Sequence, residues 1–307
     1  MRILLFGGNG QLGTELQRSL APLGELVVAT RDGISPRGTA SVVADFDAPQ
    51  SLPEIVDTVA PDVVVNAAAY TAVDRAEGDA DAAFRVNAEA PARIAEACAA
   101  RAARLVHYST DYVFDGSATR PYREDDPVAP LGVYGASKLA GERAIQASGA
   151  EHMIFRTAWV YAAHGHNFLR TMLRLAAERD ELRVVDDQFG CPTPAWLIAD
   201  ITARILVMPP RPSGLWHLAA SGSTSWRGFA DAIIEGAFSG GLLARRPVVT
   251  GIRTTEYPVA ATRPARSLLD TNRLQSDFGV VLPSWQEGLQ RVLREIAAGQ
   301  AGTIGDR

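Results

Sequence analysis

The stretch LLFGGNGQLGTEL, residues 4–16, decides the fold class. An apolar run ends at Phe6, glycines follow at positions 7, 10 and 13, and residues 11–20 continue with helical spacing. Glycines at such a turn let the backbone approach a pyrophosphate, whose charge then lies at the helix N-terminus. A glycine triplet alone is also compatible with a plain turn before a helix. Placed at the first strand-to-helix turn, it predicts a dinucleotide site whose cofactor-binding residues are Gly7, Gly10, Gln11, Leu12 and Gly13.

The first half of the chain repeats this order of strand and helix. Short aliphatic runs predict strands at 2–6, 26–29, 63–66, 105–109 and 152–156, and longer Ala-rich runs predict helices at 11–20, 51–59, 80–101 and 134–147. Because the strand runs are apolar on both faces, we expect helices on both sides of a parallel sheet. The predicted fold is therefore α/β, a Rossmann-type doubly wound parallel sheet with a smaller, interleaved C-terminal substrate domain.

Beyond residue 156 the pattern becomes less regular, with a helix predicted at 168–179 and shorter elements at 215–218, 226–237, 248–252 and 285–297. We expect a dinucleotide-binding domain over 1–155 and a mainly substrate-binding region over 156–307. Segments near 180–190 and 245–255 are predicted to return to the first domain. No linker-like stretch marks a boundary between the two.

Composition narrows the choice of partner. The 307 residues include 30 Lys and Arg against 35 Asp and Glu, a net charge of −5 without a basic run, so we expect a small-molecule partner, no nucleic acid and no membrane surface. Cys98 and Cys191 form no C-x-x-C pair, and His164 and His166 have no third ligand in sequence, so no metal site is predicted. The absence of a signal segment or an 18-residue apolar run predicts a cytoplasmic protein.

Residues between the second and third predicted strands predict the nucleotide end of the cofactor. Arg31 could pair with a 2′-phosphate, whereas Asp32 could accept from the ribose diol, so NADPH is favoured and NADH stays possible. A solvated turn is the alternative for this pair. Asp45 could accept from the adenine amino group and Phe46 could flank the ring, although a simple strand end is nearly as good an interpretation.

The reacting end is predicted from the next three segments. Small residues Ala67, Ala68 and Ala69 end a strand where open α/β sheets bind ligands, although tight packing would use them too. Tyr134 and Lys138 lie four residues apart and so share a helix face. A neighbouring ammonium lowers a phenol pKa from about 10, and such a phenol can protonate an alkoxide that forms at a carbonyl. Thr110, at the preceding strand end, could hold the same carbonyl oxygen.

The chain resembles the extended short-chain dehydrogenases/reductases, which act mainly on nucleotide sugars. The resemblance is carried by Gly7, Gly10, Gly13, Thr110, Tyr134 and Lys138. The motifs NAAAYTAVDRAE, VHYSTDYVFDG, PLGVYGASKLAGE, FRTAWVY and DDQFGCPTPA are similar to those of the family's reductases of dTDP-4-dehydro-L-rhamnose, and the likeness covers almost the whole chain. The resemblance implies that NAD(P)H delivers hydride to the 4-keto carbon, giving dTDP-L-rhamnose in the last step of its synthesis. Tyr134 would donate the proton, Lys138 would bind the nicotinamide ribose and Thr110 would bind the sugar oxygen.

The same resemblance implies the remaining substrate-binding residues. Val73 would face the sugar, Trp159 would lie against the sugar or base, and Asn167 would bind the nucleotide portion; Asp111 joins this set. For Trp159, simple packing is an equal alternative. Arg263 and Arg266 could reach the substrate diphosphate or merely cover the surface.

Some relatives dimerise through Mg²⁺ held by a glutamate that matches Glu15 and by carboxylates after a Pro-Thr pair. Here residues 194–198 carry no carboxylate, and Glu15 fits a helix-start charge, so we expect no structural Mg²⁺ and a monomer or homodimer.

Two other functions stay open: a nucleotide-sugar epimerase or 4,6-dehydratase of the same superfamily, and a non-catalytic NADP-binding regulatory subunit.

Overall fold

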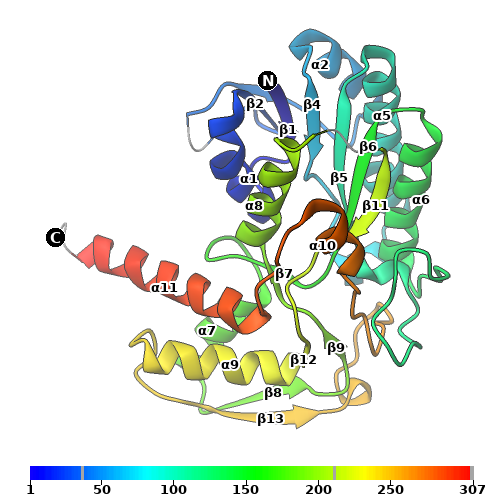
Figure 1. Ribbon diagram of the computed structural model, residues 1–307. Coiled ribbons are helices and arrows are strands. Elements are labelled where there is room, and N and C mark those ends of the chain that lie inside the picture. Colours follow the sequence, from blue (N-terminus) through cyan, green and yellow to red (C-terminus); the bar gives the residue numbers. More distant parts are fainter. Residues whose placement is uncertain (36–37, 210–211, 305–307) are drawn as a thin grey trace.

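The computed structural model describes residues 1–35, 38–209 and 212–304, and a seven-stranded parallel sheet forms its centre (Figure 1). The strand order is β11-β6-β5-β4-β1-β2-β3. These strands are β1 (Arg2–Phe6), β2 (Glu25–Thr30), β3 (Ser41–Val43), β4 (Val63–Asn66), β5 (Arg104–Thr110), β6 (His152–Thr157) and β11 (Gly214–His217). The sequence reverses direction across the sheet between β1 and β4, as in doubly wound dinucleotide-binding folds. The predicted fold class is confirmed.

Helices cover both faces of this sheet because its strands are apolar on both sides. On one face, α1 (Gln11–Leu20) and α8 (Ala195–Leu206) pack against residues such as Leu5 and Val28. On the other, α2 (Leu52–Val59), α5 (Ala90–Arg101) and α6 (Val133–Ala147) face Leu4 and Phe6 (Figure 1). Successive side chains of β1 therefore pack into two separate core layers, one on each face of the sheet.

The helix predicted at 80–101 is interrupted. The structure has α4 (Ala80–Phe84), a π-helical turn (Arg85–Glu89) and α5 in its place. Asn87 lies in the π turn, where its amide exchanges two hydrogen bonds with the Tyr70 backbone, at 2.9 and 3.0 Å. Pro91 also lacks the N–H that an uninterrupted helix would need. The turn brings Val86 to the wall of the main cavity.

A second region lies below the carboxyl ends of the central strands in Figure 1. Three two-stranded sheets belong to it: β7 (Val160–Tyr161) with β10 (Thr193–Pro194), β9 (Phe189–Gly190) with β12 (Thr224–Ser225), and β8 (Glu181–Val185) with β13 (Val248–Ile252). Its helices are α7 (Phe168–Glu178), α9 (Trp226–Ser239) and α11 (Trp285–Ile304). The short helix α3 (Val73–Ala76) instead contacts α6, and α10 (Asn272–Phe278) contacts β11 of the central sheet.

The segments near 180–190 and 245–255, predicted to return to the first domain, do not join its central sheet. β8 and β13 pair with each other instead, alongside α9 (Figure 1). Both strands alternate between buried and exposed residues, so each suits a one-sided sheet rather than a centre covered on both faces. The segments that do return to the central sheet are α8, which packs on α1, and β11, which pairs with β6.

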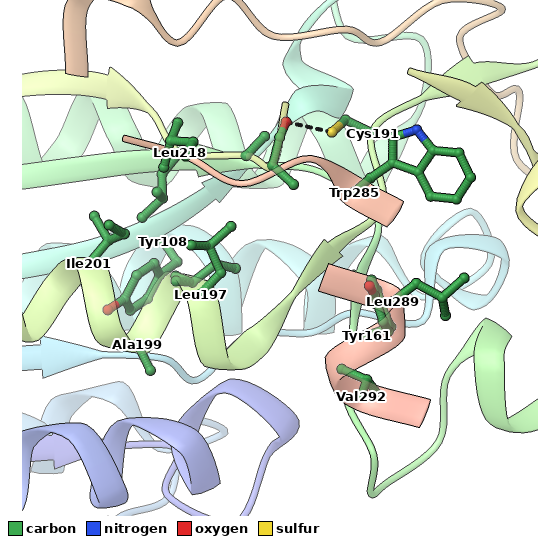
Figure 2. Packing of buried hydrophobic residues seen from close by; sticks show 14 of the residues in the cluster. Tyr108, Tyr161, Cys191, Leu197, Ala199, Ile201, Leu218, Trp285, Leu289 and Val292 are labelled. Atoms are coloured by element: carbon green, nitrogen blue, oxygen red, sulfur yellow. Dashed lines mark hydrogen bonds between the residues drawn. The ribbon is translucent and has the colours of Figure 1, made fainter. Parts of the chain in front are cut away.

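The core layer between the sheet and helices α1 and α8 continues into the second region. Figure 2 shows Tyr108 beside Leu197 and Ile201 of α8, with Tyr161 and residues of α11 further along the same layer. The Cys191 thiol donates to the Ala220 carbonyl at 2.7 Å, and burial raises its pKa to about 12, so this cysteine is an inert packing residue. No helix among the described residues is both long and apolar enough to cross a bilayer.

Candidate active site

A cavity of about 1020 Å³ opens at the carboxyl ends of the central strands, where open α/β sheets bind ligands. It brings together most of the residues predicted for the cofactor and the substrate. Those that line it are Gly7, Gly10, Gln11, Leu12, Arg31, Phe46, Ala67, Ala68, Ala69, Val73, Thr110, Asp111, Tyr134, Lys138, Trp159 and Asn167. Gly13 and Asp45 are not part of the wall.

The glycine-rich turn is built by close backbone contacts. Gly7 has φ +79°, and a β-carbon there would lie 2.6 Å from the Ala68 nitrogen. A β-carbon at Gly13 would overlap the Gly7 carbonyl oxygen, so Gly13 allows α1 to pack against the turn rather than contacting a ligand. Gly10 precedes α1, whose first N–H groups have no side-chain cap. These N–H groups are free to bind an anion in the cavity.

At the nucleotide end, Arg31 and Asp32 differ in their freedom. Asp32 Oδ1 accepts from Thr30 Oγ1 at 3.0 Å and from the Ile34 N–H at 3.1 Å, so this oxygen is engaged within its own turn, although Asp32 also lines the cavity. The Arg31 side chain is 80% exposed, and among the described residues its ion-pair partner is Asp47, at 4.0 Å. Arg31 is therefore the group that can turn to a bound phosphate.

The adenine side is less complete than predicted. Phe46 is buried against Phe6, with ring centroids 5.7 Å apart, and its edge reaches the cavity. The Asp45 carboxylate accepts from the Asp47 N–H at 3.0 Å, within its own turn. Phe46 can flank a ring in the cavity, while Asp45 acts in the structure as a turn residue.

Thr110, Tyr134 and Lys138 meet at the junction of β5 and α6. Thr110 Oγ1 donates to Asp111 Oδ1 and accepts from the Tyr112 N–H, each at 3.1 Å. Burial raises the pKa of Tyr134 to about 12, and its hydrogen bond with Thr110 only partly opposes that rise. The prediction of a lowered Tyr134 pKa is therefore wrong for this structure, because desolvation of the phenolate dominates the net shift.

Lys138 is held by groups behind the cavity. Its Nζ donates to the Tyr108 carbonyl at 2.6 Å and lies 3.3 Å from His107 Nε2, while Asn66 Nδ2 contacts His107 Nδ1 at 3.2 Å. Burial lowers the pKa of Lys138 to about 8, although the nearby Glu142 carboxylate opposes this shift. Asn66 and His107 were not predicted from the sequence. Their signal was a polar residue within each of two otherwise apolar strands.

Asp111 has an unusual environment for a carboxyl group. It is 2% exposed, and its Oδ2 has no hydrogen-bond partner among the described residues. Burial raises its pKa to about 7, against hydrogen bonds with Ser267 and Thr110 that lower it. An unpartnered buried oxygen beside Thr110 is suited to a hydroxyl group of a substrate.

The far end of the cavity is aromatic. Trp159 has φ +45°, and its indole stacks on Trp226 with centroids 3.4 Å apart. A β-carbon at Gly190 would overlap the Trp159 ring, so the absence of a side chain at Gly190 leaves room for the indole. Trp226 also lines the cavity and was not predicted. A strained backbone at a ligand-facing residue is typical of functional sites.

Asn167 links the cavity wall to α1. Its Nδ2 donates to Gln11 Oε1 at 2.7 Å and to the Ala162 carbonyl at 3.0 Å, and its Oδ1 caps α7 through the Arg170 N–H. The Asn167 amide thus fixes the loop before α7 beside the glycine-rich turn. Its predicted contact with a nucleotide would compete with these bonds.

Three further predictions concern charged residues. The prediction that Glu15 is a helix-start charge is wrong, because the first turn of α1 carries no acidic residue and Glu15 is buried further along the helix. It accepts from Arg18 at 3.2 Å and contacts His164 at 2.9 Å. No group of three or more metal-ligating side chains occurs within the part of the chain that the structure describes. Arg263 pairs with Asp74 at 2.7 Å, and Arg266 stacks on the ring of Phe189, so both are engaged outside the main cavity.

Comparisons with known proteins agree with this geometry. Residues 1–298 match the family model described as RmlD substrate binding domain. The dTDP-4-dehydrorhamnose reductase of Escherichia coli K12 is 48% identical over 299 residues, covering 96% of this chain and 98% of that protein. The Burkholderia thailandensis protein of the same name is 48% identical over 305 residues, covering 96% and 99%.

Solved structures give the same result. The crystal structure of dTDP-4-dehydrorhamnose reductase from Bacillus anthracis, in complex with NADP, has 34% sequence identity and a TM-score of 0.86, covering 96% of this chain and 99% of that one. The ortholog from Clostridium acetobutylicum has 34% identity and a TM-score of 0.87, with the same coverage. The resemblance found in the sequence is confirmed: the chain belongs to the family of the dTDP-4-dehydrorhamnose reductases.

Proposed function

We propose that this protein reduces the 4-keto group of dTDP-4-dehydro-L-rhamnose to dTDP-L-rhamnose with NADPH. The observation that carries the proposal is that Thr110, Tyr134 and Lys138 lie in one cavity with a glycine-rich helix start. The names of the relatives support the substrate, and the NADP complex of one of them supports the cofactor.

The residues present fit a nicotinamide dinucleotide. Among the described residues, a β-carbon at Gly10 would meet the Gly7 carbonyl alone within 4 Å, so this side of the turn is open to the cavity. The uncapped start of α1 would hold the pyrophosphate, and Ala67 and Ala68 would border the nicotinamide ribose. NADPH would supply the hydride when bound. Arg31 would hold the 2′-phosphate, and since Asp32 is bound within its own turn, we propose NADPH as the preferred cofactor with NADH as a weaker one.

The reaction then needs one proton at the sugar oxygen. With a pKa of about 12, Tyr134 stays protonated at neutral pH and can donate that proton as a general acid. Thr110 orients the carbonyl oxygen toward the phenol. A protonated Lys138 stabilises the phenolate that forms, and this favours the transition state over the bound ketone.

The remaining walls fit a nucleotide sugar. Val73, Asp111 and the Trp159–Trp226 pair would border the sugar and base, and Asn167 would lie at the nucleotide side. We further propose a cytoplasmic monomer or homodimer. The unpaired thiols of Cys98 and Cys191 support a reducing compartment.

The test is the loss of NADPH absorbance on addition of dTDP-4-dehydro-L-rhamnose, with identification of the product. Tyr134→Phe should lower kcat by about 10²–10⁴-fold, because the general acid is lost. Tyr257→Phe is the matched control, since Tyr257 is an exposed tyrosine outside the cavity. Full activity in Tyr134→Phe would overturn the mechanism. Turnover without net NADPH consumption would instead indicate an epimerase or dehydratase, and NADPH binding without turnover a regulatory subunit.

A further inference from the structure

Asn66, His107 and Lys138 form a buried polar chain behind the cavity. Their exposed fractions are 1%, 0% and 2%. Asn66 and His107 occupy paired positions of β4 and β5, and His107 points to α6, where Lys138 lies. The two contacts measure 3.2 Å (Asn66 Nδ2 to His107 Nδ1) and 3.3 Å (His107 Nε2 to Lys138 Nζ).

The hydrogen-bond partners of Asn66 fix the tautomer of the His107 ring. Asn66 Oδ1 accepts from the Ala68 N–H at 3.1 Å, so Nδ2 is the atom that faces the ring and it must donate. His107 Nδ1 therefore accepts and carries no proton. Burial keeps the pKa of His107 well below its usual value, so the ring is neutral and its single proton lies on Nε2.

The Nε2–H then points at Lys138 Nζ. An ammonium group has only donors, so a protonated Lys138 would face a second donor at this contact. A neutral amine resolves the conflict, because it can accept from Nε2–H and still donate to the Tyr108 carbonyl. The opposite ring tautomer would only move the conflict to Asn66.

We propose that Asn66 and His107 are positioning residues that set the charge of Lys138: Asn66 fixes the ring tautomer, and His107 Nε2–H opposes protonation of the amine. The inference rests on the proposed role of Lys138 in the reductase reaction. It adds a device that destabilises the charged form of Lys138 beyond the effect of burial alone.

Two other titratable groups near Lys138, Glu142 and Tyr134, do not oppose its positive charge. Glu142, one helical turn further along α6, favours the ammonium, but its carboxylate is already paired with Arg156 of β6. Tyr134, one turn earlier, stays neutral at the pH of interest. His107 is thus the polar side chain at hydrogen-bond distance that disfavours the charge.

The consequence is an alkaline limit on activity. Stabilisation of the phenolate needs a charged Lys138, so kcat/KM should fall as pH rises through the pKa of Lys138, near 8 in the free protein. Tyr134 cannot cause this alkaline limb of the pH profile, the fall in kcat/KM at high pH, because the pKa of Tyr134 lies far higher. Removal of the Nε2–H donor should move the limb to higher pH.

The direct test reads the tautomer without using activity. Long-range ¹H–¹⁵N spectra of the wild-type protein resolve ring nitrogens, and the chain has five histidines, so the spectrum of His107→Phe identifies the signal of His107. We expect a protonated Nε2 and an unprotonated Nδ1 between pH 6 and 9. A protonated Nδ1 in the wild-type protein overturns the proposal, whether or not any variant folds.

The second test is the pH profile of two variants. His107→Phe removes the donor, and Asn66→Asp accepts from Nδ1–H and so turns Nε2 into an acceptor for the ammonium. Each should raise the pKa of the alkaline limb by about one unit, the equivalent of one hydrogen bond. Thr202→Ala is the control: it removes the bond of Thr202 to the Tyr108 hydroxyl, on the other face of β5, and should leave the limb unchanged.

The outcomes separate the two proposals. If the protein fails to reduce the dTDP-sugar but shows the expected tautomer, the proposed function fails and the assignment of the buried chain stands. If the protein is active and neither variant moves the limb upward, or Thr202→Ala moves it equally, His107 and Asn66 have only a structural role.

Discussion

Glu142 and Arg156 form an ion pair through two hydrogen bonds in the interior, from Nε to Oε1 at 2.9 Å and from Nη2 to Oε2 at 2.7 Å. Their side chains are 2% and 4% exposed. Ser109 donates to the same carboxylate, and the guanidinium lies over the ring of Phe114. The pair joins α6 to β6 one helical turn beyond Lys138, so the position of α6 depends on it.

We expect Arg156→Met to lower the free energy of unfolding by about 3–5 kcal/mol, because it leaves the Glu142 carboxylate buried without its partner. The double variant Glu142→Leu/Arg156→Met should recover much of that loss, since neither charge stays buried. Urea unfolding of both measures the effect. Arg174→Met, which breaks the exposed pair of Arg174 with Glu178, should cost about 1 kcal/mol or less. A double variant as unstable as the sum of its single variants would contradict this account.

The glycine-rich turn gives a second prediction. Gly7→Ala should abolish cofactor binding, because its β-carbon would push the turn away from Ala68 and the residue would keep a positive φ. Gly149→Ala is the matched control: Gly149 has φ +80°, but a β-carbon there would have no neighbour within 4 Å among the described residues. It should cost only the backbone strain of about 1–2 kcal/mol and leave NADPH affinity unchanged. Titration calorimetry with NADPH measures the difference, and equal losses of affinity would show that strain alone is responsible.

The sequence predicted the central sheet well because its strands carry a strong local signal. The bounds of β1 and β4 agree with the predicted ranges, since both strands are uninterrupted apolar runs that end at a polar or glycine residue. Helix α8 was missed because it is buried nearly all round, so its apolar residues show no periodic face. A periodic pattern of apolar residues arises only where a helix has one exposed face, and the exposed face of α8 is small.

The candidate site was predictable only where residues share one element. Tyr134 and Lys138 lie on one helix, so their spacing places them on one face. The contact of His107 with Asn66 depends on which strands are neighbours and in what register, and the stack of Trp226 on Trp159 joins residues 67 positions apart. No local pattern encodes such pairs. They follow from the sheet order and from the packing of the second region.

Cofactor choice gives a third prediction. Arg31→Ala should weaken NADPH binding by about 10–150-fold, the value of a hydrogen bond to a charged group, and change NADH binding little. Arg93→Ala is the control, since Arg93 pairs with Glu96 on an exposed helix face away from the cavity. KM measured for each cofactor gives the ratio. An equal loss for NADPH and NADH would show that Arg31 does not contact the 2′-phosphate.

The last prediction concerns Glu15 and magnesium. Glu15 lies beside a cation of the protein itself: Arg18 binds Glu15 at 3.2 Å and Asp200 of α8 at 2.7 Å, so its guanidinium bridges the two carboxylates. Burial raises the pKa of Glu15, but hydrogen bonds to His164 and Arg18 outweigh it and the net shift is downward. Glu15 therefore stabilises the fold above its unfolded pKa of about 4.3, and this contribution is lost as pH falls through the lower folded pKa.

Two measurements check this arrangement. Glu15→Gln should lower the free energy of unfolding at pH 7 by about 1–3 kcal/mol, and its difference from the wild-type protein should shrink as pH falls below about 4. Because the Arg18 guanidinium already bridges the two carboxylates, the elution volume in size-exclusion chromatography should be the same with Mg²⁺ and with a chelator. Arg18→Ala removes the bridge between the two carboxylates, and it is the variant in which we expect Mg²⁺ sensitivity to arise. A magnesium-dependent dimer of the wild-type protein would show that the guanidinium yields its place to the metal.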